Sequence, residues 1–128
     1  MDERERHEAG MQVRRSVLGD AHVDRAEAAK NGFDAEFQDL ITRYAWGEIW
    51  TRPGLQRHTR SLLTIALMVA LNRGEELRLH LRAARNNGVT AEEIREVLMH
   101  CAIYCGVPAA NPAFQAAREI MNEQVQPR

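Results

Sequence analysis

A nearly uninterrupted apolar run, Leu62 to Leu71, is the feature that most constrains the fold of this chain, and only Thr64 breaks it. A helix that is apolar on almost every side must be buried on most sides. In a chain of 128 residues this predicts either a central position or coverage by another subunit. The run is about half of the ~20 residues that a membrane span needs, and the N-terminal DERERHE contains no apolar signal core. We therefore expect a cytoplasmic homo-oligomer that does not enter a membrane.

The charge of the chain indicates no binding to nucleic acid or to a membrane surface. The net charge is −1, and acidic and basic residues interleave along the sequence. Lys30 is the only lysine, so nearly every cation is a guanidinium, which binds carboxylates in a bidentate manner. This bias fits a carboxylate-rich small molecule as the partner; an arginine-rich base composition of the genome explains the same bias.

Periodicity and capping signals predict an all-α fold of about six helices with short connections, and no strand pattern or repeat is present. We expect a charge-dense helix over 3–18 and a turn or two of helix over 22–30. Five further helices are expected: one after Asp34, one across the apolar run, one over about 75–87, one that starts at Thr90 and one that starts at Asn111. Thr90 and Glu93 form a capping box, which makes the helix from Thr90 the best-defined element.

The length predicts a single domain over residues 1–128, with 1–32 as a peripheral N-terminal helical segment. Gly10 weakens the helix in that segment. At the other end, Asn111-Pro112 is the signature of a helix start, and a polar tail begins at Gln124.

The segment after Asp34 predicts a helix whose face leads to a carboxylate. Four apolar residues recur with helical spacing and are expected to be buried: Phe37, Leu40, Ile41 and Tyr44. Carried one step further, this face reaches Glu48, which would then point toward the core or a pocket. Gly47 leaves open the alternative of a solvated glutamate in a loop. Trp46 and Trp50 flank Glu48, where such rings are typical core or interface residues.

The following helix sets His80 on one stripe with Leu77, Leu81 and Ala84, so His80 is predicted to face inward. An inward histidine is either a hydrogen-bonded core residue or a catalytic group. The pattern alone leaves both interpretations open.

Cys101 and Cys105 stand four residues apart on one predicted helix, with Cβ atoms about 5–6 Å apart, too far for an unstrained disulfide. No third or fourth ligand lies near them in the sequence, so no metal site is predicted. We expect both to be reduced residues on the buried face, with His100 off that face.

Phosphate-binding glycine loops, a serine-hydrolase elbow and a zinc-protease motif are all absent. The candidate groups for chemistry are therefore His, Glu and Arg side chains. These can move protons and hold anions without a cofactor.

The segments YAWGEIWTRPGL (44–55) and RSLLTIALMVALNRGEELRLHLRAARNNGVTAEEIREVLMHCAIYCGVPAANPAF (60–114) resemble the gamma-carboxymuconolactone decarboxylases of the beta-ketoadipate pathway. That family shares its fold with the alkylhydroperoxidase D-like proteins, whose signature is a glutamate followed by Cys-x-x-Cys-x-x-x-His. His80 aligns with the signature histidine, which puts Arg73 and Glu76 at the two cysteines and Ser61 at the glutamate. The redox dithiol is therefore missing, and the resemblance disfavours peroxide reduction.

The resemblance implies cofactor-free decarboxylation of a dicarboxylate lactone by a homo-oligomer, typically a hexamer. Under this hypothesis His80 donates a proton or stabilises a dienolate, and Glu48 orients or reprotonates it. The substrate-binding candidates are Arg60, Arg73, Trp46, Tyr104 and Ser61. Two alternatives stay open: a thiol-dependent peroxidase of the same fold using Cys101 or Cys105, and a non-catalytic helical assembly protein.

Overall fold

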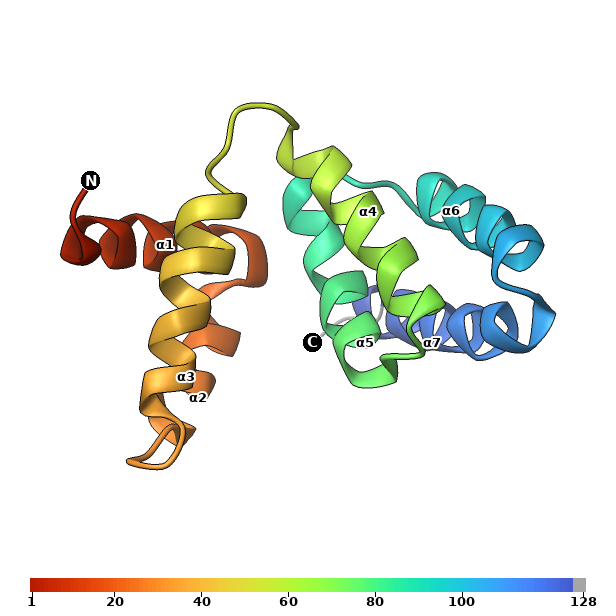
Figure 1. The fold of residues 1–128 in the computed structure, drawn as a ribbon. Coiled ribbons are helices and arrows are strands. Elements are labelled where there is room, and N and C mark those ends of the chain that lie inside the picture. The colour runs from red at the N-terminus through yellow and green to blue at the C-terminus, as the bar shows by residue number, and fades with distance from the viewer. Residues whose placement is uncertain (126–128) are drawn as a thin grey trace. The chain divides into compact units, whose positions relative to one another are not determined.

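The computed structural model describes residues 1–125, and the prediction of an all-α fold is confirmed, with seven α-helices and no strand in that range. Two compact units divide at Arg57 and His58 (Figure 1). The first contains α1 (Glu3–Leu18), α2 (Asp20–Ala29), α3 (Ala35–Leu40) and the π-helix η1 (Ile41–Ile49). The second contains α4 (Arg57–Ala70), α5 (Gly74–Ala84), the 3₁₀ turn η2 (Arg85–Asn87), α6 (Ala91–Tyr104) and α7 (Val107–Val125). Of the predicted polar tail, residues 126–128 lie outside the described part.

In the first unit, α1 packs across the continuous helix formed by α3 and η1 (Figure 1). Val13 and Val17 of α1 are buried, and so is Arg14, whose guanidinium contacts the carboxylate of Glu27 on α2 at 3.3 Å. A buried guanidinium needs such a partner to offset its lost hydration. The predicted helices over 3–18 and 22–30 are both present.

The predicted buried face after Asp34 is wrong. Phe37, Leu40 and Tyr44 are exposed, Phe37 by 58%. The buried residues of η1 are Thr42, Trp46 and Gly47, whose spacings of four and five residues suit the wider turn of a π-helix. The Asp34 side chain makes no capping hydrogen bond to α3; it accepts a hydrogen bond from the backbone N–H of Asn31 at 2.8 Å.

In the second unit, one apolar core joins all four α-helices and includes Ile65 of α4, Leu81 of α5, Leu98 of α6 and Ile120 of α7. The capping box at Thr90 is confirmed: its Oγ1 accepts from the N–H of Glu93 at 3.1 Å, and its own N–H donates to Glu93 at 2.9 Å. Gly88, at φ 77°, ends η2 in the left-handed conformation that glycine adopts readily.

The helix α4 buries only the face carrying Ser61, Ile65 and Val69, so of the two alternatives for the apolar run it does not take a central position in this unit. One expectation for the second unit is wrong. The helix α7 begins at Val107 rather than at Asn111, with Pro112 inside it. Because Pro112 lies near the helix start, its missing N–H removes only the single bond toward the residue four positions earlier.

Candidate functional site

His80 lies on α5 between buried Leu77 and Leu81 and is itself half-buried, with its Nδ1 atom in the protein interior. This arrangement agrees with the predicted inward stripe. A half-buried imidazole exposes part of one edge while the rest is fixed by packing. This geometry suits a group that exchanges a proton with a bound molecule.

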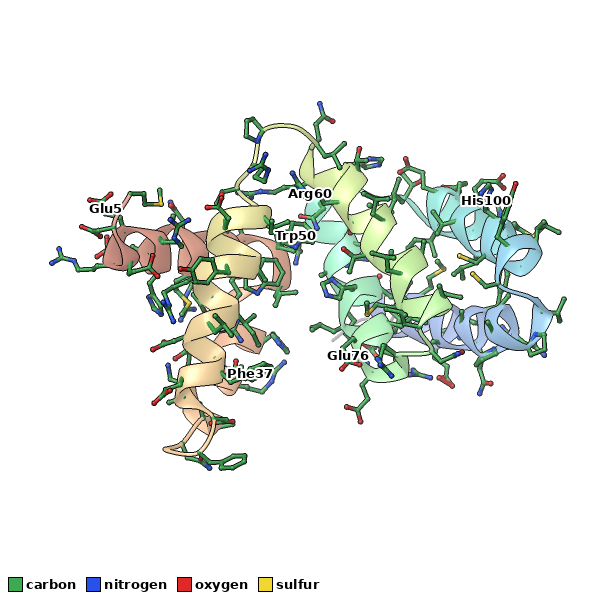
Figure 2. All side chains as sticks on the ribbon, in the orientation of Figure 1. Glu5, Phe37, Trp50, Arg60, Glu76 and His100 are labelled. Atoms are coloured by element: carbon green, nitrogen blue, oxygen red, sulfur yellow. The ribbon has the colours of Figure 1, made fainter. Side chains whose placement is uncertain are left out.

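Arg60 and Ser61 lie near the start of α4, and the chain reverses direction between α4 and α5. The start of α4 therefore lies at the end of this helical hairpin away from Arg73. Figure 2 labels Arg60 near one end of the hairpin and Glu76 near the other. Ser61 is 1% exposed, and its Oγ has no hydrogen-bond partner among residues 1–125; the Nε atom of Arg60 is buried.

Arg73 is at the opposite end of the hairpin, at the N-cap of α5. It lines a cavity of about 250 Å³ between the α4–α5 corner and α7, a lining that includes neither His80 nor Arg60. Arg78 also lines this cavity and pairs with Glu119 at 2.7 Å, whereas the Arg73 guanidinium has no ion pair within the described residues. Arg73 therefore lines a cavity to which neither His80 nor Arg60 contributes.

Glu48 lies on η1 in the first unit, within a helix rather than a loop. Its carboxylate accepts a hydrogen bond from Nη1 of Arg6 on α1, and Nη1 of Arg52 lies 3.9 Å from its other oxygen. The side chain is about half exposed. The expectation that Glu48 points into the core is therefore wrong for this unit, because an arginine of α1 holds its carboxylate at the surface.

An ion network surrounds the Arg6 side chain. Its Nε donates to Glu3 at 3.2 Å, and Glu3 also accepts from Arg43 at 2.7 Å and from the hydroxyl of Tyr44 at 2.9 Å. The hydrogen bonds from Arg43 and Tyr44 hold the pKa of the Glu3 carboxyl below its usual value. The hydrogen bond to Glu3, with the charge of Glu48, holds the pKa of Arg6 above its usual value.

The sequence interpretation missed Arg6 and Glu3 entirely. The signal that could have found them is a pair of glycines. A Cβ at Gly10 would lie 1.9 Å from the carbonyl oxygen of Thr42, and one at Gly47 would lie 2.4 Å from the carbonyl oxygen of Arg6. Each glycine is therefore required where α1 and η1 approach closely. From the sequence alone, Gly10 indicates only a weakened helix, and Gly47 leaves open whether Glu48 lies on a helix or in a loop.

The two aromatic candidates occupy different environments. Trp46 is buried in the first unit, with its ring centroid 5.1 Å from that of Trp50, so packing accounts for it. Tyr104 ends α6, is 78% exposed and stacks on His100 at 4.8 Å. Within its own chain Tyr104 therefore faces solvent rather than a pocket.

The cysteines differ from one another in burial. Both are free; Cys101 is buried as expected, whereas Cys105 is exposed, so its predicted place on the buried face is wrong because α6 ends at Tyr104. Burial, and secondarily the neighbouring Cys105, raises the pKa of the Cys101 thiol, which disfavours the thiolate that a peroxidase requires. No group of three or more His, Cys, Asp or Glu in residues 1–125 is arranged to hold a metal ion, and no helix there could span a membrane.

The fold and these side chains define a class: an all-α protein whose candidate site carries acid–base and guanidinium groups and lacks a dithiol beside His80. Comparison with known proteins gives the family. The Carboxymuconolactone decarboxylase family profile matches residues 35–119. A 4-carboxymuconolactone decarboxylase from Acinetobacter baylyi is 50% identical over 123 residues, which are 96% of this chain and 92% of that protein. The chain belongs to the carboxymuconolactone decarboxylase family.

Two further relatives are also named as decarboxylases. A nitrosuccinic acid decarboxylase from Metarhizium robertsii is 45% identical over 116 residues, 91% of this chain and 81% of that protein. A 4-carboxymuconolactone decarboxylase sequence from Pseudomonas putida is 62% identical over 48 residues, 38% of this chain and all of that sequence. The predicted family membership is thus confirmed, and the relatives share one type of reaction.

Proposed function

We propose that this protein decarboxylates 4-carboxymuconolactone to beta-ketoadipate enol-lactone and carbon dioxide in aromatic catabolism. The observation that carries the proposal is the 50% identity to the Acinetobacter baylyi enzyme over nearly the full length of both chains. The thiol-dependent alternative is disfavoured by the raised pKa of buried Cys101. Two free cysteines also support a reducing compartment, and we place the protein in the cytoplasm.

The chemistry needs no cofactor because the substrate itself accepts the electrons. Cleaving the bond to the departing carboxylate leaves an electron pair that delocalises into the conjugated lactone carbonyl and forms a dienolate. The protein must then supply a cation for the remaining carboxylate, a donor for the developing oxyanion and an acid for the ring carbon.

We assign these tasks to four side chains. His80 is the proton donor, or the donor to the dienolate oxygen, because its imidazole is half-buried with Nδ1 inside. Arg60, near the start of α4, holds a carboxylate, and Ser61 offers a buried hydroxyl beside it in the sequence. Glu48 is the carboxylate that orients or reprotonates His80.

The remaining candidates depend on assembly. We propose a homo-oligomer, a hexamer as in the family resemblance, because α4 carries an exposed apolar stripe formed by Leu63, Leu67 and Leu71. Tyr104 is exposed, and Arg73 lines a cavity apart from His80. Either can therefore serve as substrate contact only in a pocket shared with a neighbouring copy. Trp46 supports the Glu48 helix from within its own unit.

The oligomer is tested by light scattering on a size-exclusion column. Wild type should elute at about six times the 14.6 kDa chain mass, and Leu67→Glu should shift it toward smaller species. Asn122→Glu adds the same charge at an exposed polar position of α7 and should leave the mass unchanged. A wild-type protein that elutes as a single chain contradicts the proposed assembly.

Nitrosuccinic acid is the second candidate substrate, because a relative named for that reaction is 45% identical to this chain. A nitro group, like a conjugated lactone carbonyl, accepts the electron pair that carbon dioxide leaves behind. The two substrates therefore require the same acid and cation, but the lactone is a ring and nitrosuccinic acid is an open chain. The ratio of their kcat/KM values separates the two functions.

The test is to mix the purified protein with each substrate and follow carbon dioxide release. Lactone turnover should far exceed the background rate, and His80→Ala should reduce kcat by about 10²–10⁴-fold. His100→Ala, which removes an exposed histidine from α6, is the matched control and should retain activity. Wild-type turnover at the background rate contradicts the proposed function, and unchanged kcat in a folded His80→Ala variant removes His80 from the mechanism.

A further inference from the structure

We propose that Arg6, on the N-terminal helix α1, is the positioning residue for Glu48 and holds its carboxylate in one orientation for proton transfer. The inference rests on the proposed function, because that function gives Glu48 its role. The contact joins residues 42 positions apart in the sequence and lies within the first unit. No local sequence pattern indicates it.

The Arg6 guanidinium is itself fixed on several sides. Nε donates to Glu3, Nη1 donates to Glu48, and the guanidinium carbon lies 5.3 Å from the ring centroid of Tyr44. Only 18% of the side chain is exposed. A planar guanidinium with two anchored nitrogens and an aromatic ring beside it has little freedom to rotate, so it presents a fixed donor to Glu48.

The backbone brings Arg6 to Glu48 by two close approaches. Gly10 lies against the carbonyl of Thr42, and Gly47, directly before Glu48, lies against the carbonyl of Arg6. Any side chain at either glycine would push α1 away from η1 by roughly 1 Å or more, since a Cβ would sit well inside normal contact distance. The position of Arg6 is therefore determined by the helix crossing as well as by its ion pairs.

The π-helical register of η1 completes the arrangement. It places Arg43, Tyr44 and Glu48 where all three contact Glu3 or Arg6 of α1, while Thr42 and Trp46 are buried. π-Helices are rare and often occur at functional sites. This π-helix presents a carboxylate to solvent while a second helix fixes its orientation.

The charges around Glu48 indicate what removal of Arg6 would do. The groups facing the carboxylate are Arg6 from α1 and Arg52 from the segment after η1, with Glu3 beyond Arg6. Without Arg6, the remaining cation is Arg52, whose Nη1 lies 3.9 Å away. Glu48 would turn toward Arg52 or sample several rotamers, and misplacement of a catalytic group by about 1 Å can cost about 10²-fold in rate.

The experiment is a double-mutant cycle with kinetics on the lactone. Arg6→Gln should lower kcat about tenfold to a hundredfold with KM within about twofold, because the orientation of Glu48 matters in the transition state. In a Glu48→Gln background, Arg6→Gln should cause no further loss. Arg6→Lys should restore part of the rate, since an ammonium keeps the charge but cannot bridge two carboxylates in a planar fork.

A matched control and an activity-independent measurement complete the design. Arg4→Gln removes an exposed arginine of the same helix, paired only with Glu8 at the surface, and should leave kcat unchanged. NMR of the Arg6 guanidinium should show slow rotation in wild type and faster rotation in Glu48→Gln.

The outcomes separate the two claims. If Glu48→Gln loses activity while Arg6→Gln keeps wild-type kcat, or if the two losses simply add, the positioning role is refuted and the proposed function stands. If the Arg6 guanidinium rotates equally fast in wild type and Glu48→Gln, the contact that the inference needs is absent. If wild type does not turn over the lactone, the proposed function fails first.

Discussion

Gly10→Ala should destabilise the first unit, although alanine is the better helix former. A Cβ at this position would lie 1.9 Å from the backbone carbonyl oxygen of Thr42, which cannot rotate away as a flexible side chain could. Overpacking of this kind costs about 1–3 kcal/mol, and the gain in helix propensity returns up to about 1 kcal/mol. The net effect should be a loss of about 1–2 kcal/mol in the free energy of unfolding.

The assay uses the placement of the two tryptophans. Trp46 and Trp50, the only tryptophans of the chain, both lie in the first unit, so their fluorescence during urea unfolding reports on that unit. For an m-value near 2 kcal/mol/M, the midpoint should fall by roughly 0.5–1 M. Circular dichroism at 222 nm reports on all helices and shows whether the second unit unfolds separately.

Gly74→Ala is the matched control. Gly74 begins α5, and a Cβ there would meet nothing within 4 Å, so alanine should be neutral or slightly stabilising. A Gly10→Ala protein with an unchanged or higher fluorescence midpoint would refute the claim that α1 and η1 are in contact at Thr42. The same result would weaken the geometric basis for placing Arg6 against Glu48.

Two further predictions concern titratable groups of the second unit. His58 contacts Glu93 at 2.7 Å, and this hydrogen bond, with that from the Thr90 backbone, lowers the pKa of the Glu93 carboxyl. Because the pKa of Glu93 is lower in the folded state than its usual value of 4.5, the ionised carboxylate stabilises the folded protein above about pH 4.5. This stabilisation is lost as the pH falls through the pKa of the folded state. Glu93→Gln should therefore flatten the decline of the unfolding midpoint below about pH 4.5; an equally steep decline would contradict the assignment. Separately, iodoacetamide at neutral pH should label exposed Cys105 well before buried Cys101, read by mass spectrometry, while decarboxylation survives. Faster labelling of Cys101, or loss of activity on labelling Cys105 alone, would reopen a thiol mechanism.

The sequence predicted the second unit well where the signals are local. The capping box at Thr90 and the inward stripe of α5 both depend on residues within one or two turns. The start of α7 was misassigned because Asn111-Pro112 matches a helix start as closely as the true start at Val107 does. The local sequence is compatible with a helix start at either position. In the structure the helix includes the buried residues Ala110 and Ala113.

The first unit was predicted less well for a different physical reason. A π-helix changes the residues that share a face, so a 3.6-residue period applied to Phe37–Tyr44 selects the wrong side. Gly10 and Gly47 are informative only as a pair, since each permits one close approach between α1 and η1. The pairing of Arg6 with Glu48 follows from that crossing, and no local periodicity links residues so far apart.

The α4–α5 hairpin shows how the same scaffold supports a different chemistry. His80 aligns with the histidine of the alkylhydroperoxidase D-like signature, and the cysteines of that signature would stand at Arg73 and Glu76, at the N-terminus of α5. A helix N-terminus lowers the pKa of a thiol, so those positions suit a reactive thiolate. Here they carry a guanidinium and a carboxylate, and the position of the signature glutamate carries Ser61, whose hydroxyl is buried. With the thiolate and its neighbouring acid both absent, we propose that His80 serves as the proton donor, a role that a decarboxylation without redox chemistry requires.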